Sequence, residues 1–345
     1  MKLFKSLFCL AAILGLLVVL TGCPKTAIKA DPKGMVYFSY FDTVSYIYCY
    51  SDDSNEEFSE KCSEASAILG EYHKLFDIYY EHAGVTNLRT LNLNAGGEPM
   101  KVDSKLVDFL IYAKELYTLT NGEMNIMMGS VLRLWHDARE AGVSIPSEES
   151  LTEAALHTDI SCLEIDKENG TVRISDPEAS IDVGALGKGY ATEKAAEHLE
   201  EIGAESYVLN IGGNIRIIGT KPDGSGWLTG IKDPQNTSNY AIYINLANTS
   251  CVTSGVYERY FTVDGVRYHH IIDKDTLMPS AYFTSLTVLT KDSGLADALS
   301  TALFSMSYED GYKIVESLDG VEVIWILADG EIRMSEGAKA FVSEQ

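Results

Sequence analysis

A carboxylate and a hydroxyl four residues apart, Asp297 and Thr301, are the first side chains in the sequence that could do chemistry together. Residues four apart share one face of a helix, so the pair would lie side by side. Such oxygen ligands suit Mg²⁺, especially when substrate phosphates complete its coordination. The alternative is a Thr301 hydroxyl bonded back to its own helix and an Asp297 that is an ordinary surface residue.

A helix that carries this pair is predicted over residues 293–306, with Asp292 or Ser293 as its cap. The apolar stripe that would face the core consists of Leu295, Leu299, Leu303 and Met306. The opposite face carries small or apolar residues beside the pair, namely Ala296, Ser300 and Phe304. A solvated face would usually carry lysines or glutamates, so we expect Asp297 and Thr301 to be covered and closely approached.

The glycine-rich segment 180–190 is a second candidate site. A strand ending at Asp182, a turn and a helix over 188–202 would point backbone N–H groups and the positive helix end outward, which suits a phosphate. The segment is not a Walker A loop, because Lys188 is followed by Gly189, and its glycine spacing is not that of the dinucleotide motif. A tight strand-to-helix turn without a ligand is the alternative.

Two adjacent histidines, His269 and His270, form the third candidate. They fall on the return strand of a hairpin predicted around Asp264 and Gly265. Alternation along a strand sends them to opposite faces. One is then an ordinary strand histidine, and the other could be a general base or a phosphate partner.

Hairpins and helices must position these residues. Helices are predicted over 55–76, 104–120, 188–202, 293–306 and 308–318. Strands are predicted within 36–50 and over 162–165, 171–174, 259–263, 266–272, 321–327 and 331–334. Hairpins mixed with helices favour an α+β fold with largely antiparallel sheets over a doubly wound parallel sheet.

The composition is that of a globular protein, with 46% hydrophobic and 10% aromatic residues. The formal net charge of −23 argues against a nucleic-acid partner. Zinc is not expected, because no cysteine pair has CxxC spacing. Cys49 and Cys62 could form a disulfide, although free buried thiols are an equal alternative, and the remaining body cysteines are Cys162 and Cys251.

The N-terminus predicts export and a lipid anchor. Lys2 and Lys5 precede an apolar run that is too short for a comfortable membrane span and is typical of a signal peptide. The run ends in Leu20-Thr21-Gly22-Cys23, which resembles a bacterial lipobox. We expect a lipoprotein signal at 1–22, a lipidated (palmitate-type) tether at 23–34 that begins at Cys23, and one domain at 35–345. The protein would sit on the extracytoplasmic face of the cell membrane, although an ordinary secretory signal is the alternative.

Five segments together resemble the ApbE family, the FAD:protein FMN transferases, over residues 36–335. They are 182–190, 209–214, 252–255, 270–273 and 296–302. The resemblance implies an ApbE-like (T-fold-related) α+β fold, with mixed, largely antiparallel sheets and packed helices in a single compact unit. It also implies Mg²⁺-dependent transfer of FMN from FAD to a threonine hydroxyl of an acceptor flavoprotein, which leaves a phosphoester-linked FMN and releases AMP.

The same resemblance implies roles for individual residues. Mg²⁺ would be held by Asp297, Thr301 and the backbone carbonyl of Ala185, and His270 would be the base. FAD contacts are implied at Phe41, Tyr79, Glu123, Met124, Asn125, Asp182, Lys188 and Ile272.

Several positions depart from the family's pattern. The chain has Phe41-Asp42-Thr43 in place of Met-Gly-Thr, Asp77-Ile78-Tyr79 in place of Ser-Thr-Tyr, and Asn125 in place of Asp. Lys274 stands where proline is usual, and Leu277 where a turn glycine is typical. These departures leave two alternatives open, a lipid-anchored FAD-binding protein without transfer and a Mg²⁺-dependent FAD pyrophosphatase, in which water replaces the threonine.

Overall fold

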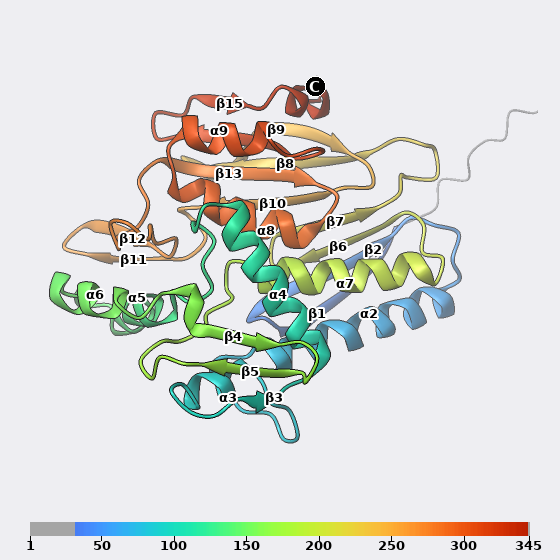
Figure 1. The fold of residues 1–345 in the computed structure, drawn as a ribbon. Helices are drawn as coiled ribbons and strands as arrows, with labels where there is room; N and C mark the ends of the chain where they lie inside the picture. The colour runs from blue at the N-terminus through green and yellow to red at the C-terminus, as the bar shows by residue number, and fades with distance from the viewer. Residues whose placement is uncertain (1–31, 344–345) are drawn as a thin grey trace, which may run out of the picture.

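The structure, a computed structural model, describes residues 32–343 and has the expected α+β architecture (Figure 1). The signal peptide and the lipidated Cys23 that the sequence predicts lie outside the described residues. Within the described range, no helix is long and apolar enough to cross a membrane.

An eight-stranded sheet forms the centre of the molecule, with the strand order β1-β2-β6-β7-β10-β13-β14-β15. Every neighbouring pair in it is antiparallel, so the sheet is more uniform than the mixed arrangement that was expected. The strands are β1 Lys33–Tyr40, β2 Thr43–Cys49, β6 Tyr207–Ile211, β7 Asn214–Ile218, β10 Ser250–Gly255, β13 Phe283–Thr290, β14 Glu322–Leu327 and β15 Ile332–Met334.

Helices cover one face of this sheet, and a long hairpin covers the other (Figure 1). The helices of the first face are α2 Asn55–Phe76, α4 Ser104–Leu119, α7 Gly187–Glu201, α8 Ser293–Ala302 and α9 Tyr308–Glu316. The hairpin on the second face consists of β8 Trp227–Asp233 and β9 Asn236–Leu246.

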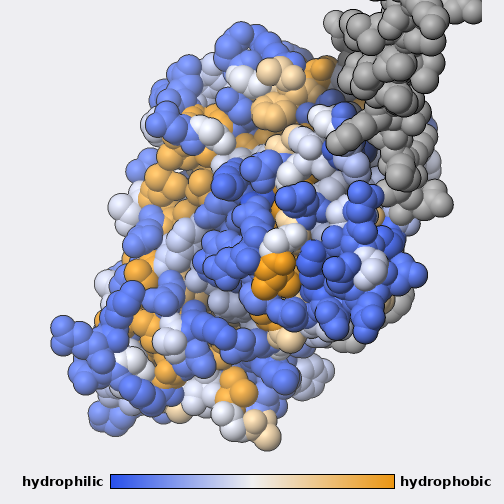
Figure 2. Space-filling view, turned by 90° about the vertical axis from the view of Figure 1, so that its right-hand side faces the viewer, coloured by the Kyte–Doolittle hydropathy of each residue, from blue (hydrophilic) through white to orange (hydrophobic). Residues whose placement is uncertain are grey.

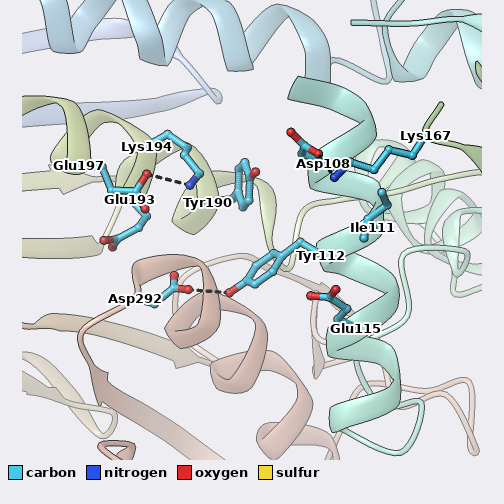
Figure 3. A pocket seen from close by; sticks show the side chains of 10 residues that line it. All are labelled: Asp108, Ile111, Tyr112, Glu115, Lys167, Tyr190, Glu193, Lys194, Glu197 and Asp292. Carbon is cyan, nitrogen blue, oxygen red and sulfur yellow. Dashed lines mark hydrogen bonds and ion pairs between the residues drawn. The ribbon is translucent and has the colours of Figure 1, made fainter. Parts of the chain in front are cut away.

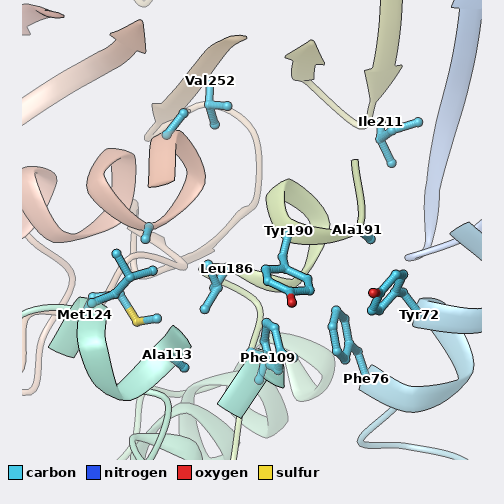
Figure 4. Close-up of a cluster of buried hydrophobic side chains, with 14 of the residues drawn as sticks. Tyr72, Phe76, Phe109, Ala113, Met124, Leu186, Tyr190, Ala191, Ile211 and Val252 are labelled. Carbon is cyan, nitrogen blue, oxygen red and sulfur yellow. The ribbon is translucent and has the colours of Figure 1, made fainter. Parts of the chain in front are cut away.

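Strand alternation divides the core between these two faces. In β14, Val323 and Trp325 join the helix-side cluster, whereas Ile324 and Ile326 join the hairpin-side cluster. Figure 4 shows the helix-side cluster, in which aromatic rings from α2, α4 and α7 meet. The helices α7 and α8 are therefore packed against a rigid sheet.

Smaller elements surround this core. A three-stranded sheet with the order β3-β5-β4 consists of β3 Met100–Lys101, β5 Thr171–Ile174 and β4 Leu163–Asp166. The hairpin of β11 Tyr260–Val263 and β12 Val266–His269 packs through Phe261 and Tyr268 against Trp135 of α5. The remaining helices are α3 Leu88–Leu93, α5 Gly129–Ala141 and α6 Glu148–Ala155.

Most of the predicted elements are present. The predicted helix over 55–76 coincides with α2, and α4 ends where Asn121 and Gly122 take positive φ values of 53° and 86°. The prediction of a strand ending at Asp182 is wrong, because Ser180 makes only a single bridge to Met128. The predicted helix over 293–306 ends at Ala302 and continues as a 3₁₀ turn, Leu303–Ser305. The elements that were not predicted are α3, α5, α6, β3, β6, β7, β8, β9, β10 and β13, which include four strands of the central sheet.

The cysteines of the domain are separate thiols, so Cys49 and Cys62 do not form the disulfide that the sequence left open. Both side chains are buried in the helix-side core. The face of the molecule shown in Figure 2 is mainly hydrophilic, with smaller hydrophobic areas between the polar side chains. This surface agrees with the excess of acidic residues in the sequence, which has 50 Asp and Glu against 27 Lys and Arg.

Candidate active site

The N-terminus of α7 touches the first turns of α8 directly. The Gly189 N–H donates to Asp297 Oδ2 at 2.8 Å. A Cβ on residue 189 would lie 2.3 Å from the Ser293 carbonyl oxygen and 2.4 Å from the Asp297 Cβ, so only glycine allows this approach. We call this contact, formed by Ala185, Lys188, Gly189, Asp297 and Thr301, the α7–α8 junction.

Three oxygen atoms at the α7–α8 junction are free. Since the Gly189 N–H is directed to Asp297, the Ala185 carbonyl accepts no hydrogen bond from residues 32–343. The Thr301 hydroxyl also makes no hydrogen bond within that range, and the side chain that bonds back to the Asp297 carbonyl is that of Ser300, at 2.9 Å. The third is the second carboxylate oxygen of Asp297, a carboxylate with which the Asn214 side chain also interacts. The predicted Mg²⁺ ligands therefore have unused lone pairs, and they lie on or directly before the two elements that the Gly189–Asp297 bond joins.

Asp297 is buried, with only 4% of the residue exposed. The alternative interpretation, that it is an ordinary surface residue, is therefore wrong. Burial raises the pKa of its carboxyl group, and the nearby Lys188 charge opposes that rise. A buried carboxylate favours a cation close by, since an unpaired buried charge is costly. The face predicted to be covered is indeed covered, as Ala296, Ser300 and Phe304 are fully buried.

Lys188 supplies a positive charge at this place. Its Nζ donates to the Gly184 carbonyl at 3.3 Å and lies 4.0 Å from Asp297 Oδ2. The ammonium group therefore sits between the turn before α7 and the carboxylate of α8. The Asp297 carboxylate thus attracts a cation, and with the Thr301 hydroxyl and the Ala185 carbonyl it makes up a set of hard oxygen donors of the kind that Mg²⁺ prefers.

A buried ion pair holds the two helices in register. Glu193 of α7 accepts from the Ser293 N–H at 2.7 Å and from Arg216 Nε at 3.1 Å. Arg216 is fully buried in β7 and also bonds to Glu200 at 2.9 Å. Breaking such a pair leaves a buried charge without compensation, so these residues fix α7 and α8 onto the sheet. The sequence motifs did not single out either residue.

Asp182 lies in the extended segment that leads to α7. Its Oδ1 accepts from the Gly184 N–H at 2.8 Å, and its own N–H donates to the Ile126 carbonyl at 2.8 Å. Burial raises the pKa of the Asp182 carboxyl group, and the charges of His136 and Lys188 act against that rise. Asp182 is therefore close to the junction, and His136 is a neighbour that sequence reasoning missed.

Tyr79 and Phe41 lie further along the same side of the site. Tyr79 is 40% exposed, and its ring centroid is 5.3 Å from that of His136. Burial of its phenol and the charge of Asp182 raise the pKa of Tyr79. Phe41 has a positive φ of 54°, and its N–H donates to His73 Nδ1 at 3.3 Å. The Asp42 charge acts on both Tyr79 and His73, which places the 41–42 turn near Tyr79.

The resemblance implied FAD contacts at residues 123–125, but the side chains of these residues make their contacts within the protein. Met124 is 1% exposed and its side chain lies in the core (Figure 4), so the predicted contact of this residue with FAD would involve its backbone. Asn125 uses its amide internally, donating to the Thr158 carbonyl at 2.9 Å and accepting from the Met127 N–H at 2.9 Å. Glu123 forms an ion pair with Lys274 at 3.3 Å.

His269 and His270 separate as the alternation predicts, although β12 ends at His269, before the predicted Ile272. His269 is buried and bonds to the Ser280 carbonyl at 2.8 Å. His270 is exposed, and its Nδ1 donates to the Arg259 carbonyl at 3.2 Å, which leaves Nε2 free. Ile272 packs beside the Trp135 cluster.

The surrounding protein lowers the pKa of His270, first by desolvation and then through the charges of Arg259 and Lys188. Because the ring is open to solvent, we expect a smaller lowering than for an enclosed histidine. His270 is therefore neutral near pH 7, and Lys188 connects it electrostatically to the α7–α8 junction. Arg259 is a second residue that sequence reasoning missed.

Two pockets of the described residues lie elsewhere. One, of about 270 Å³, lies between α4, α7 and the start of α8 (Figure 3), where the Tyr112 hydroxyl donates to Asp292 at 2.9 Å. The other, of about 700 Å³, lies beside residues 203–206 and 218–222. None of the predicted site residues lines either pocket.

Comparisons with known proteins match this chain to one family. The model of the ApbE family matches residues 41–325. A Treponema pallidum protein named FAD:protein FMN transferase is 31% identical over 265 residues, which cover 72% of this chain and 73% of the relative. A Vibrio cholerae protein of the same name is 29% identical over 330 residues, covering 95% of this chain and 94% of the relative.

Solved structures agree with these matches. The crystal structure of the ApbE protein from Thermotoga maritima superposes with a TM-score of 0.81 at 30% identity, covering 91% of this chain and all of that one. The flavin transferase ApbE from Vibrio cholerae superposes with a TM-score of 0.78 at 27% identity, covering 90% of this chain and 99% of that one.

Proposed function

This chain belongs to the ApbE family and is an FAD:protein FMN transferase, and on that premise we propose a site and a mechanism for the transfer. The pyrophosphate of FAD binds at the α7–α8 junction together with Mg²⁺. The FMN part of FAD is passed to a threonine hydroxyl of an acceptor flavoprotein. The observation that carries this proposal is the set of three free oxygens at the junction, from Ala185, Asp297 and Thr301.

The proposed reaction is a phosphoryl transfer. The threonine oxygen forms a bond to the flavin-side phosphorus of FAD, and the bond from that phosphorus to the bridging oxygen breaks. The electron pair of the broken bond leaves on AMP, and the threonine proton passes to a base. Little covalent chemistry falls to the protein, so its residues act by positioning and by electrostatic stabilisation.

Mg²⁺ fits the donor set, because a buried carboxylate, a hydroxyl and a carbonyl are hard oxygen ligands that leave positions for phosphate oxygens. When bound, the ion would neutralise charge that develops on the phosphates. Asp297 supplies the one negative charge of the set, and the Gly189 N–H fixes that carboxylate at Oδ2. Lys188, whose ammonium already lies in the junction, can pair with a phosphate oxygen.

His270 is the proposed base. Its Nδ1 is fixed by the Arg259 carbonyl, so the free Nε2 can accept the threonine proton. A lowered pKa keeps the ring neutral and ready to accept, and the negative charge of a bound pyrophosphate would raise that pKa toward the working pH. Asp182, Tyr79 and Glu123 are proposed to contact other parts of FAD.

We further propose that the enzyme is a lipoprotein held on the extracytoplasmic face of the cell membrane through Cys23. The support is the sequence Leu20 to Cys23 after an apolar run. Two acyl chains on one cysteine anchor a protein stably, whereas a single chain binds reversibly. Such an anchor would keep the enzyme near membrane-associated or exported acceptors.

A stoichiometric assay tests the proposed reaction. The purified enzyme is incubated with FAD, Mg²⁺ and an acceptor domain that has a flavinylation threonine, and AMP release is measured beside the FMN bound to the acceptor. Transfer predicts equal amounts of both, and an acceptor with that threonine changed to alanine should gain none. Release of AMP that is equally fast with and without acceptor would instead indicate the pyrophosphatase reaction.

A further inference from the structure

The turn between β1 and β2, residues 40–43, holds two residues in a backbone conformation that side chains rarely adopt. Phe41 and Asp42 have φ values of 54° and 49°, whereas a two-residue turn of this kind favours glycine or asparagine. A left-handed conformation costs energy for a residue with a Cβ, and strain of this kind concentrates at ligand-binding sites. The turn therefore needs contacts from other elements to keep its shape.

His73 of α2 makes such a contact. Its Nδ1 accepts a hydrogen bond from the Phe41 N–H at 3.3 Å, and this N–H lies in the turn, outside the paired strands. The His73 ring is also edge-on to the Phe41 ring, with centroids 5.5 Å apart, and 6.2 Å from the Tyr40 ring. At the other end of the turn, a Cβ on Gly212 would lie 2.4 Å from Thr43 Oγ1, so Thr43 packs tightly against the turn between β6 and β7.

The His73 ring is suited to accept this hydrogen bond. It is half-buried, and burial lowers its pKa, so the ring is neutral near pH 7. With Nδ1 as the acceptor, the proton of the neutral ring is on Nε2. Without the ring, the Phe41 N–H would lose this acceptor, and the strained turn would lose its contact with α2 on that side.

The same histidine lies near Tyr79, another residue for which the family resemblance implies an FAD contact. The His73 ring centroid is 6.1 Å from that of His82, whose Nε2 bonds to Asp77 Oδ2 at 2.9 Å. The other oxygen of Asp77 accepts the Tyr79 N–H at 2.8 Å. His73 thus stands between the two aromatic residues, Phe41 and Tyr79, that are expected to touch FAD.

We propose that His73 is a positioning residue, whose neutral ring holds the 40–43 turn in the conformation that contacts FAD. The inference rests on the proposed function and on the FAD contact implied for Phe41. Since His73 touches Phe41 and Tyr40, it acts on FAD through the turn. Its loss should therefore weaken FAD binding and leave the chemical step at the α7–α8 junction unchanged.

The test compares full-length variants in detergent at about pH 8, where the ring is neutral. The dissociation constant of FAD is read from flavin fluorescence with Mg²⁺ present, and the transfer rate is measured at saturating FAD. His73→Ala should weaken FAD binding about fivefold, as expected for one lost hydrogen bond, with the saturated transfer rate unchanged. His73→Asn places an amide oxygen near the position of Nδ1 and should recover most of the affinity. It also carries the test if His73→Ala fails to fold.

Ser66→Ala is the matched control. The Ser66 hydroxyl hydrogen-bonds to the Tyr40 hydroxyl at 2.7 Å, so this variant also removes a contact between α2 and β1, but it leaves the Phe41 N–H paired. Its FAD affinity should stay at the wild-type value. Wild-type affinity in His73→Ala would overturn the inference, as would an equal loss of affinity in Ser66→Ala or no recovery in a folded His73→Asn. A wild-type protein that binds no FAD would overturn the proposed FAD site itself.

Discussion

At the scale of residues, the candidate site depends on oxygen atoms that have lone pairs available for a cation. The pair Asp297 and Thr301 could be recognised from spacing alone, because four residues make one helical turn. The free carbonyl of Ala185 could not be recognised from spacing, since it arises only when the Gly189 N–H bonds to a carboxylate 108 residues away. A local pattern indicates which side chains share a face, but not which backbone groups a distant contact releases.

Asp297→Asn should separate catalysis from stability. Asparagine keeps the shape and an oxygen for the Gly189 N–H, but it removes the charge whose burial raises the pKa of Asp297. We expect an unchanged or higher melting temperature without Mg²⁺, because the buried charge is costly. Mg²⁺-dependent transfer should fall about 100-fold or more, since a bound metal supplies several kcal/mol of transition-state stabilisation. Calorimetry and rate measurements check both; full activity would disprove the metal assignment.

His270→Ala should slow transfer about 100-fold while FAD affinity stays unchanged. Its folded-state pKa is lowered from 6.5, so the neutral, active ring persists to a pH below that value. The acid limb of the wild-type rate profile should therefore lie below pH 6.5, and it should be absent in the variant. A pH profile of kcat/KM, which reports the free enzyme before FAD raises this pKa, measures this limb. An identical limb in the variant would show that another group is the base.

At the scale of elements, the close approach of α7 and α8 is what forms the site. Gly189→Ala would force a Cβ into the Ser293 carbonyl and the Asp297 Cβ, which lie 2.3 and 2.4 Å away. Overpacking of this kind costs about 1–3 kcal/mol, and we expect Mg²⁺-dependent FAD binding to be lost with it. Chemical denaturation and flavin binding are the measurements.

Gly311→Ala in α9 is the control for that variant. Its nearest neighbour would be Leu303 Cδ2 at 3.5 Å, an ordinary contact, so alanine should stabilise the helix by up to about 1 kcal/mol. FAD binding should be unaffected. If Gly189→Ala behaved like Gly311→Ala, the tight contact at the junction would not be required.

The ion pair of Lys274 and Glu123 connects the loop that follows His270 to the segment after α4. Burial raises the pKa of the Glu123 carboxyl group even beside Lys274, so Lys274→Ala should raise it further. FAD affinity of Lys274→Ala should then fall as the pH decreases toward the Glu123 pKa. A double-mutant cycle with Glu123→Gln should give a coupling of about 0.5–1 kcal/mol in FAD affinity. Zero coupling would mean that the pair does not support the FAD site.

The helices and strands that were predicted correctly are those marked by local sequence signals, such as helix caps and turn residues. Helix α2 begins at a capping box of Ser54 and Glu57, and the β11–β12 turn uses Asp264 and Gly265 at positive φ. The strand predicted up to Asp182 fails because the Asn92 side chain takes both the N–H and the carbonyl of Ile181 in place of a neighbouring strand. Helix α5 was missed because Met128 provides no side-chain cap, so no local start signal precedes the helix.

At the scale of the whole molecule, the proposed location depends on the acidity of the chain and on the proposed lipid anchor. The net charge of −23 disfavours adhesion to anionic lipid, so membrane attachment would depend on Cys23. Cys23→Ala should therefore move the protein from the membrane fraction to the soluble fraction, with its transfer rate in solution unchanged. Fractionation and radiolabelled palmitate incorporation measure this. A Cys23→Ala protein that stays in the membrane fraction would contradict the anchor.

The intact mass of an acceptor protein tests the central claim, that transfer depends on the cation site at the α7–α8 junction. Wild-type enzyme with FAD and Mg²⁺ should add one FMN to the acceptor threonine, and a chelator or Asp297→Asn should prevent the addition. An acceptor that gains FMN equally well from Asp297→Asn, or in the presence of the chelator, would contradict the claim.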